Sequence, residues 1–342
     1  MYSETDINSA VEAGAISPEA AAAFRNHIAL GRATPAADEE SFRLLTGFND
    51  IFVSIALALS LVAIGWIGGT IWAPVGGIGV AVAAWLLAEY FTRQRRMALP
   101  SILLLLAFVG GVAGALGGLM SELNPDLPDR VDAIIAGGIG LITAGAAWLH
   151  WRRFMVPITV AAGAVALSAT GIGLLAAAIG PQTMETAVYP LVLIAGLAVF
   201  AFAMRWDISD TRRTTRRSDV AFWLHLAAAP MIAHSVFKML GVFDGPMGAG
   251  MGAVVIALYI VFGFIALAID RRALLVSSLA YVLYALSELF RTAGAVELSA
   301  AFTGLVIGSA LLTLSAFWQP MRRLVVGVLG GLGQRLPPVV AA

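Results

Sequence analysis

The stretch IFVSIALALSLVAIGWIGGTI, residues 51–71, carries no charged side chain. A helix needs roughly 20 consecutive apolar residues to cross the hydrocarbon core of a bilayer, and this stretch supplies that length. It also lacks the alternation of polar and apolar residues that a strand with one buried face would show. The stretch therefore predicts a transmembrane helix.

Similar runs fill most of the chain. Hydrophobic residues make up 60% of the sequence and charged residues 12%, whereas soluble domains carry about 25% charged residues. Prolines stand near the starts of several runs, where a missing amide hydrogen costs nothing; these are Pro74, Pro100, Pro157 and Pro190. We expect an all-α integral membrane protein with about ten transmembrane helices, at about 51–71, 74–91, 99–120, 131–149, 155–179, 188–204, 220–239, 250–269, 273–291 and 298–317.

Arginine pairs predict the orientation of these spans. One pair follows each even-numbered run, so the chain divides into five hairpins; the pairs are Arg95–Arg96, Arg152–Arg153, Arg212–Arg213, Arg271–Arg272 and Arg322–Arg323. If these ends lie in the cytoplasm, all of the 21 lysines and arginines except Arg130, Lys238 and Arg291 are cytoplasmic. This asymmetry follows the positive-inside rule. It predicts a bacterial inner-membrane protein with both termini in the cytoplasm. A division into two inverted halves of five spans is an alternative.

The polar residues at the front of the chain predict a small helical segment. Ser3 is suited to cap a first helix that Gly14 ends, and Ser17 with Pro18 begins a second helix that runs to about Leu30. Acidic residues outnumber basic ones here, which argues against nucleic-acid binding. We expect three parts: a cytoplasmic helical hairpin (1–47), a ten-helix transmembrane domain (48–319) and a cytoplasmic or interfacial tail (320–342).

Two stretches carry a resemblance to known sequences. They are VEAGAISPEAAAAF (11–24) and RWDISDTRRTTRRSDVAFWLHLAAAP (205–230). With the ten runs, they resemble bacterial multi-pass "predicted membrane protein" families of unknown function that have a short N-terminal cytoplasmic helical hairpin. The resemblance implies a topology and a location, and it carries over no catalytic residue.

The ninth run, ALLVSSLAYVLYALSELFR (273–291), has a polar stripe. At about 100° per residue, five polar side chains fall within an arc of roughly 80°. They are Ser277, Tyr281, Tyr284, Glu288 and Arg291. Because charged groups at the bilayer centre cost roughly 2.5–3.5 kcal/mol each, such a stripe should face protein or water.

The seventh run contains HLAAAPMIAHSVFK (225–238), which includes the only lysine of the chain. His234 and Lys238 share one helix face, and their depth matches that of Glu288 on the ninth run. We therefore expect a polar site between these two helices. Pro230 frees the carbonyl of Leu226 nearby. His225 lies on nearly the opposite face of a straight helix, so it joins this site only if Pro230 rotates it.

A purely structural interpretation of the same residues stays open. Glu288 and Arg291 stand three residues apart and would then neutralise each other on one helix. Lys238 would extend its ammonium group to the membrane surface, and Pro230 would be an ordinary kink. In the third run, Gly110, Gly114 and Gly118 predict a ridge for close helix packing. The arginine-rich loop 205–219 is expected to set topology and to contact anionic lipid headgroups.

These observations limit the possible functions. The absence of cysteine excludes disulfides and thiolate chemistry, and no histidine or carboxylate spacing suits a metal. We identify no catalytic residue, cofactor or metal site. The leading hypothesis is a permease or carrier for a small solute, with proton coupling as one form of it. The alternative is a non-catalytic membrane scaffold that recruits a protein partner through the N-terminal hairpin. A membrane enzyme ranks third because no catalytic constellation is present.

Overall fold

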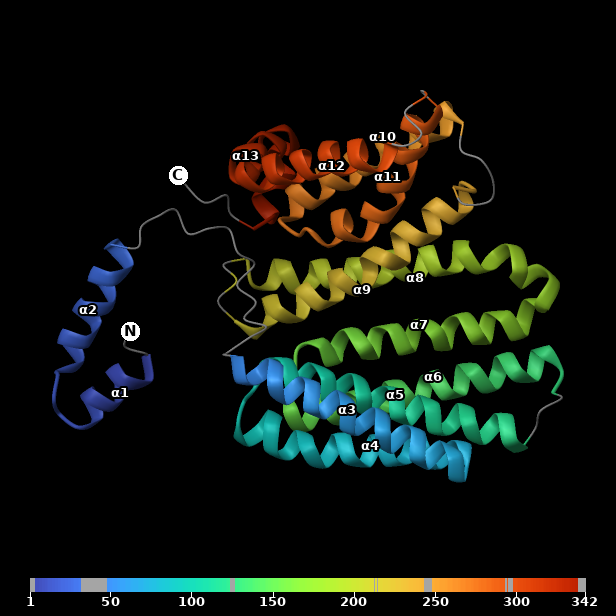
Figure 1. Ribbon diagram of the computed structural model, residues 1–342, viewed down its shortest axis with the longest axis horizontal. Helices are drawn as coiled ribbons and strands as arrows, with labels where there is room; N and C mark the ends of the chain where they lie inside the picture. Colours follow the sequence, from blue (N-terminus) through green and yellow to red (C-terminus); the bar gives the residue numbers. More distant parts are fainter. Residues whose placement is uncertain are drawn as a thin grey trace. The chain divides into compact units, whose positions relative to one another are not determined.

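The chain is all-helical. The computed structural model describes residues 4–31, 48–123, 127–211, 213, 215–242, 248–292, 294 and 298–337, and no strand occurs among them. The helices are α1 (Glu4–Glu12), α2 (Pro18–Gly31), α3 (Phe48–Ile71), α4 (Ala73–Ala88), the π-helix η1 (Glu89–Gln94), α5 (Ala98–Leu123), α6 (Asp129–Phe154), α7 (Ile158–Ile179), α8 (Pro181–Ser209), α9 (Arg216–Met239), α10 (Ala249–Ile269), α11 (Ala273–Thr292), α12 (Ser299–Ala316), α13 (Trp318–Leu329) and the 3-10 helix η2 (Gly330–Arg335) (Figure 1).

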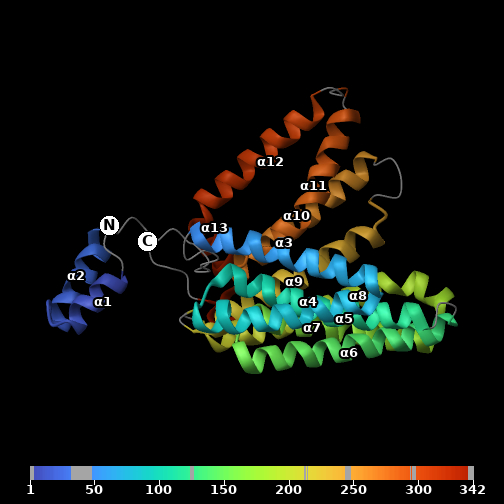
Figure 2. The ribbon, with the colours of Figure 1, turned by 60° about the horizontal axis from the view of Figure 1, so that its bottom comes forward.

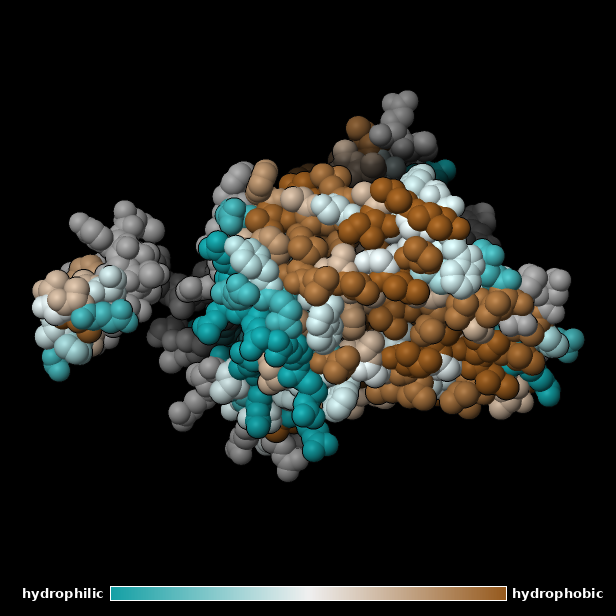
Figure 3. Space-filling view, turned by 90° about the horizontal axis from the view of Figure 1, so that it is seen from below, coloured by the Kyte–Doolittle hydropathy of each residue, from teal (hydrophilic) through white to brown (hydrophobic). Residues whose placement is uncertain are grey.

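The described residues contain ten helices that are long and apolar enough to cross a membrane: α3, α4 with η1, and α5 to α12. Their outward surfaces carry large apolar side chains. Trp66, Leu86, Ile194, Ile260 and Leu312 are each between 63 and 75% exposed. On the face drawn in Figure 3, apolar side chains cover the middle of these helices and polar side chains gather at one end. Soluble monomers rarely expose apolar surface on this scale, so the ten spans indicate a multi-pass membrane protein.

One predicted boundary is wrong. The apolar run at 188–204 placed Pro190 near the start of its span, but α8 begins at Pro181 and Pro190 lies inside it. Gly180 ends α7 with a positive φ of 82°, and Pro181 then occupies the first turn of α8. The first turns of α8 are polar, so a search for apolar residues misses them.

The chain divides into two compact units. One comprises residues 1–41 with 340–342, and the other residues 42–339. In the first unit α1 and α2 form the predicted hairpin, with Gly14 at a φ of 70° after α1. The Ala20 amide donates to the Ser17 hydroxyl at 3.1 Å, which is the expected N-cap of α2. The expected cap at Ser3 lies outside the described residues.

We expect Ser17→Ala to weaken the start of α2. Loss of an N-cap costs about 1 kcal/mol, which corresponds to roughly fivefold faster local opening. Hydrogen exchange on the full-length protein should show faster exchange in the first turn of α2 and unchanged exchange in α3. Ser9→Ala, a substitution of an exposed α1 serine, serves as the control and should leave α2 unaffected.

In the second unit, the three most extensively packed helix pairs are α6 with α7, α4 with α5 and α8 with α9, and each pair is joined at an arginine-bearing end. Figures 1 and 2 show α3 to α8 lying alongside one another, with α11 and α12 inclined to them. A Cβ built on Gly77 of α4 would lie 2.3 Å from the Ala115 amide nitrogen of α5. A Cβ on Gly140 of α6 would lie 2.7 Å from the Thr170 hydroxyl of α7. The closest packing thus groups α4 with α5 and α6 with α7, which differs from the grouping of the five predicted hairpins.

The predicted glycine ridge on α5 is only partly correct. Among the described residues, no atom of a neighbouring helix lies within 4 Å of a Cβ built on Gly110 or Gly114. Instead Gly111 meets α4, where its Cβ would lie 2.8 Å from the Ala81 nitrogen. Gly118 also faces α4, and a Cβ built on it would lie 3.1 Å from the Ala73 carbonyl carbon. A four-residue spacing defines a face of small residues, but the rotation of the helix in the bundle decides which face is packed.

Gly77→Ala should therefore destabilise the protein, because its methyl group would overlap the backbone of α5. Overpacking of this kind costs about 1–3 kcal/mol. The melting temperature in detergent should fall by several degrees, and Gly110→Ala, which adds a methyl group in open space, should melt like the wild type. Equal melting of both variants would contradict this close approach of α4 and α5.

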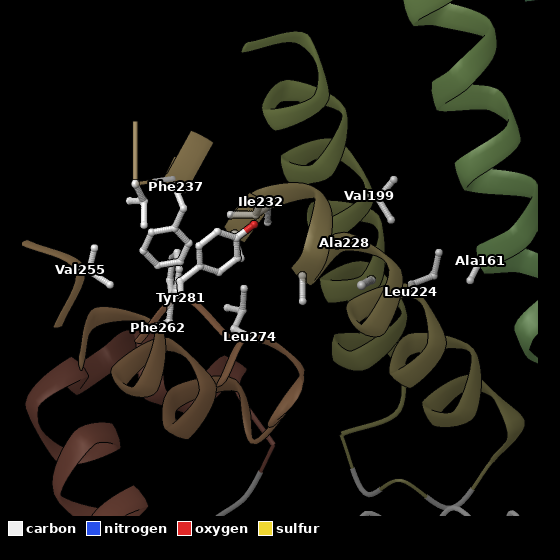
Figure 4. Packing of buried hydrophobic residues seen from close by; sticks show 14 of the residues in the cluster. Ala161, Val199, Leu224, Ala228, Ile232, Phe237, Val255, Phe262, Leu274 and Tyr281 are labelled. Carbon is white, nitrogen blue, oxygen red and sulfur yellow. The ribbon is translucent and has the colours of Figure 1, made fainter. Parts of the chain in front are cut away.

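Helix α9 lies at the centre of the largest core. It has the largest buried share of the ten spans, and it packs against α7, α8 and α11. Figure 4 shows the cluster, with Leu224, Ala228, Ile232 and Phe237 of α9 among residues of its neighbours. Polar groups on α9 are therefore held close to three other helices.

Candidate functional site

The predicted contact between the seventh and ninth spans is present. These spans are α9 and α11, which pack against each other. The Nδ1 atom of His234 forms a hydrogen bond with the hydroxyl of Tyr281. The Tyr281 ring stacks on Phe237 with ring centroids 4.2 Å apart, as Figure 4 shows. Phe237 in turn meets Phe262 edge to face at 6.0 Å. Aromatic packing thus positions the hydroxyl that His234 contacts.

A third helix contributes to this site. Tyr189 of α8 meets the His234 ring edge-on with centroids 5.9 Å apart. Lys238 lies one turn from His234 on α9 and close enough to Tyr281 for an electrostatic interaction. We call His234, Tyr281, Tyr189 and Lys238 the α9–α11 site. Tyr189 was not predicted from the sequence, because the apolar sixth run contains no other polar residue at that depth.

Glu288 and Arg291 pair with each other. The Arg291 guanidinium lies 3.1 Å from the Glu288 carboxylate, and the two side chains are 57% and 16% exposed respectively. This is the pairing expected from the structural interpretation. Glu288 stands two turns beyond Tyr281 on α11, or about 10 Å along the helix axis. Tyr284, between them, is partly buried against the α9 core. Glu288 therefore lies at the edge of the α9–α11 site, with its charge balanced on its own helix.

Pro230 stands one turn before His234 on α9, whereas His225 lies apart from the α9–α11 site. Pro230 lies inside α9, which continues through it, and its ring is exposed. His225 is 2% exposed and belongs to a different group of side chains, nearer the start of α9. The two histidines are nine residues apart, which places them on opposite faces of α9 at about 100° per residue.

A buried ionic cluster surrounds His225. The Arg271 guanidinium donates to Asp207 at 2.6 and 3.3 Å, and Nε2 of His225 lies 2.8 Å from the same carboxylate. Arg271 also donates to the Ser218 carbonyl at 3.1 Å. None of the three side chains is more than 4% exposed. We call Asp207, His225 and Arg271 the Asp207 cluster; it joins α8, α9 and the connection between α10 and α11.

A second group of charged residues is centred on Asp270, which directly precedes Arg271 of the Asp207 cluster. Asp270, in the left-handed conformation at the end of α10 with a φ of 59°, accepts from Arg213 and from the indole of Trp318, each at 2.8 Å. Arg322 of α13 is fully buried and approaches Asp270 at 3.5 Å. Arg272 lies over the Trp318 ring at 4.6 Å. The segment after the tenth span is therefore tied to the α10–α11 connection.

Neither cluster was predicted from the sequence. The arginine pairs were interpreted only as topology signals, whereas several of these arginines also make buried ion pairs. The available signal was an aspartate beside each arginine group, in RWDISD (205–210) and IDRR (269–272). A similar pair occurs at Glu89, which contacts Arg93 at 3.3 Å and also binds Arg153 of α6 at 2.7 Å.

The remaining polar groups do not suggest metal chemistry. Within the part of the chain that the structure describes, no three His, Asp or Glu side chains are grouped so as to hold a metal ion. His150 is fully buried beside Phe108, Trp85 and Phe154, with ring centroids 5.7, 6.1 and 4.6 Å away. Its surroundings are those of a packed core residue.

Comparison with known proteins adds no further constraint. No protein-family model matches the chain, and no curated protein or solved structure is significantly similar to it. The resemblance of residues 11–24 and 205–230 to membrane families of unknown function therefore stays a prediction.

Asp207→Asn should destabilise the protein strongly. Removing one partner from a buried ion pair costs about 3–5 kcal/mol, because Arg271 is left charged and unpaired. The double variant Asp207→Leu with Arg271→Met removes both charges and should recover much of that loss. Thermal unfolding in detergent measures both effects. A single variant as stable as the wild type would contradict the structural role of the cluster.

Proposed function

We propose that the protein is a carrier for a small solute in the bacterial inner membrane, with both termini in the cytoplasm. The observation that carries the proposal is the α9–α11 site, where a histidine, a lysine and two tyrosines from three apolar helices lie together. Polar and ionisable groups inside membrane spans are costly and commonly mark the path of a substrate or a proton. A helix bundle without such a path would be more stable with apolar residues at these positions.

Two prolines support this proposal. Pro230 lies one turn before His234 in α9, and Pro190 directly follows Tyr189 in α8. Each proline leaves the carbonyl four residues earlier without its helical amide partner. Backbone carbonyls released from helical bonding coordinate ions in many transporters. Both prolines adjoin the α9–α11 site.

Proton coupling is part of the proposal. Histidine is the side chain best suited to exchange a proton near neutral pH, and His234 contacts a tyrosine hydroxyl that relays a proton or binds a solute. Glu288, with Arg291, would lie at the outer mouth of the path and select solutes by charge. The Asp207 cluster would lie at the opposite end of α9 and hold the helix in place.

Flux through proteoliposomes tests the carrier. With a panel of radiolabelled metabolites and with a pH-sensitive dye, we expect His234→Gln and Tyr281→Phe to reduce uptake at least tenfold, and Glu288→Gln to reduce it or change its selectivity. The control is Glu185→Gln, which removes an exposed carboxylate at the predicted outer end of α8. Failure of the wild type to move any solute, or equal flux in all variants, would overturn the proposal.

The orientation has its own test, because the chain contains no cysteine. Thr183 and Ser209 are exposed near opposite ends of α8. In intact spheroplasts a membrane-impermeant maleimide should label Thr183→Cys. It should label Ser209→Cys only after permeabilisation. The reverse pattern would place the termini outside the cytoplasm.

A scaffold that does not transport is the second candidate. It is favoured by the separate compact unit that contains α1 and α2. Deletion of residues 1–41 should then abolish recruitment of a protein partner, while His234→Gln leaves recruitment unchanged. If the protein is a carrier, His234→Gln should reduce solute flux, and deletion of residues 1–41 should leave the flux unchanged.

A further inference from the structure

An apolar groove lies between α6, α7 and α8. Its volume is about 480 Å³, within the range of about 300–1,000 Å³ that is typical of ligand pockets. Small residues, including Ala147, Gly163 and Ala198, leave the space, and the side chains of Trp148, Trp151 and Trp206 border it. Among the described residues that line it, Thr159 carries the one hydroxyl group, and none has an amide or charged side chain. Such a lining suits a hydrocarbon chain better than a polar solute.

The groove is open on its outer side. Trp148, Leu167 and Phe202 line it and are 59%, 54% and 40% exposed. All three helices that form it are candidate membrane spans, so this exposed side would face the bilayer hydrocarbon. An acyl chain could therefore enter sideways from the membrane.

Two arginines flank the arginine-bearing end of the groove. Arg152 directly follows Trp151, and its guanidinium lies 5.2 Å from the Trp148 ring, over a residue that lines the groove. Arg205 directly precedes Trp206 on α8, about 60° around the helix from Phe202. Both arginines are exposed. The positive charges thus stand where the headgroup of a lipid would lie if its chain occupied the groove.

These two arginines differ from their neighbours in their pairing. Arg153 pairs with Glu89, Arg271 with Asp207, and Arg213 with Asp270. Among the described residues, neither Arg152 nor Arg205 has an acidic side chain within salt-bridge distance. Guanidinium groups bind phosphate through paired hydrogen bonds. The arginine-bearing end of the groove can therefore bind an anion.

We propose that the groove binds an anionic phospholipid from the adjacent leaflet, with one acyl chain between α6, α7 and α8 and the headgroup phosphate at Arg152 and Arg205. The site is distinct from the α9–α11 site and does not depend on the carrier proposal. Net charge favours phosphatidylglycerol over a zwitterionic lipid of the same chain length.

Spin-labelled lipids in vesicles that contain the full-length protein test this site. With phosphatidylglycerol and phosphatidylcholine probes in phosphatidylcholine vesicles, the wild type should immobilise the anionic probe with roughly thirtyfold preference, as expected for two arginines near the membrane surface. Arg152→Gln with Arg205→Gln should lose most of this preference. Arg323→Gln, which removes an exposed arginine of α13, should keep it.

A second pair of variants tests the groove itself. Gly163→Leu has room for its Cβ, 3.7 Å from that of Ala147, and its side chain would fill the groove. Gly145→Leu adds the same side chain on α6 in open space. The first should reduce immobilisation of both probes and the second should not, with unchanged melting temperatures. Equal lipid binding by Gly163→Leu and Gly145→Leu would overturn the proposal. It is also overturned if Gly163→Leu changes the oligomeric state, because the groove would then be a protein interface.

Discussion

A bilayer core offers no hydrogen-bond partner to a peptide group, and the other features of this chain follow from that constraint. Every backbone amide and carbonyl in a span must bond within the chain, so the runs form continuous helices. Once formed, these helices gain little from burying apolar surface, because lipid chains are as apolar as leucine. Close contact between backbones then has to hold them together, as at Gly77 against Ala115 and at Gly140 against Thr170.

The same constraint gives buried charges their importance. Water cannot screen Asp207, so its carboxylate is compensated by Arg271 and by a hydrogen bond that it accepts from His225. Asp270 is compensated by Arg213 and by the Trp318 indole. These contacts join the connections between α8 and α9 and between α10 and α11 to α13. The arginine-bearing end of the second unit is therefore held by directional bonds, whereas its middle is held by packing.

The polar residues of this molecule form three groups that differ in burial and in pairing. Arginines such as Arg271 and Arg322 are buried and paired, and they serve the fold. Arg152 and Arg205 are exposed beside an apolar groove and suit a lipid headgroup. The α9–α11 site combines His234 with tyrosines of two neighbouring helices. A solute path at that site and a lipid site at α6–α8 would use different faces of the same bundle.

The sequence by itself determined the all-helical class, the number of spans and the hairpin of α1 and α2, because each depends on local properties: the length of an apolar run, a capping serine, a helix-ending glycine. The polar faces of the seventh and ninth spans also predicted that these two helices lie in contact. Only the tertiary structure decided which faces meet. Gly111 packs where Gly110 and Gly114 were expected to, Glu288 pairs within its own helix, and His225 joins Asp207 and an arginine 64 residues further along the chain from that aspartate. The rotation of each helix is decided by the shape and charge of its neighbours in space, which no local pattern along the chain records.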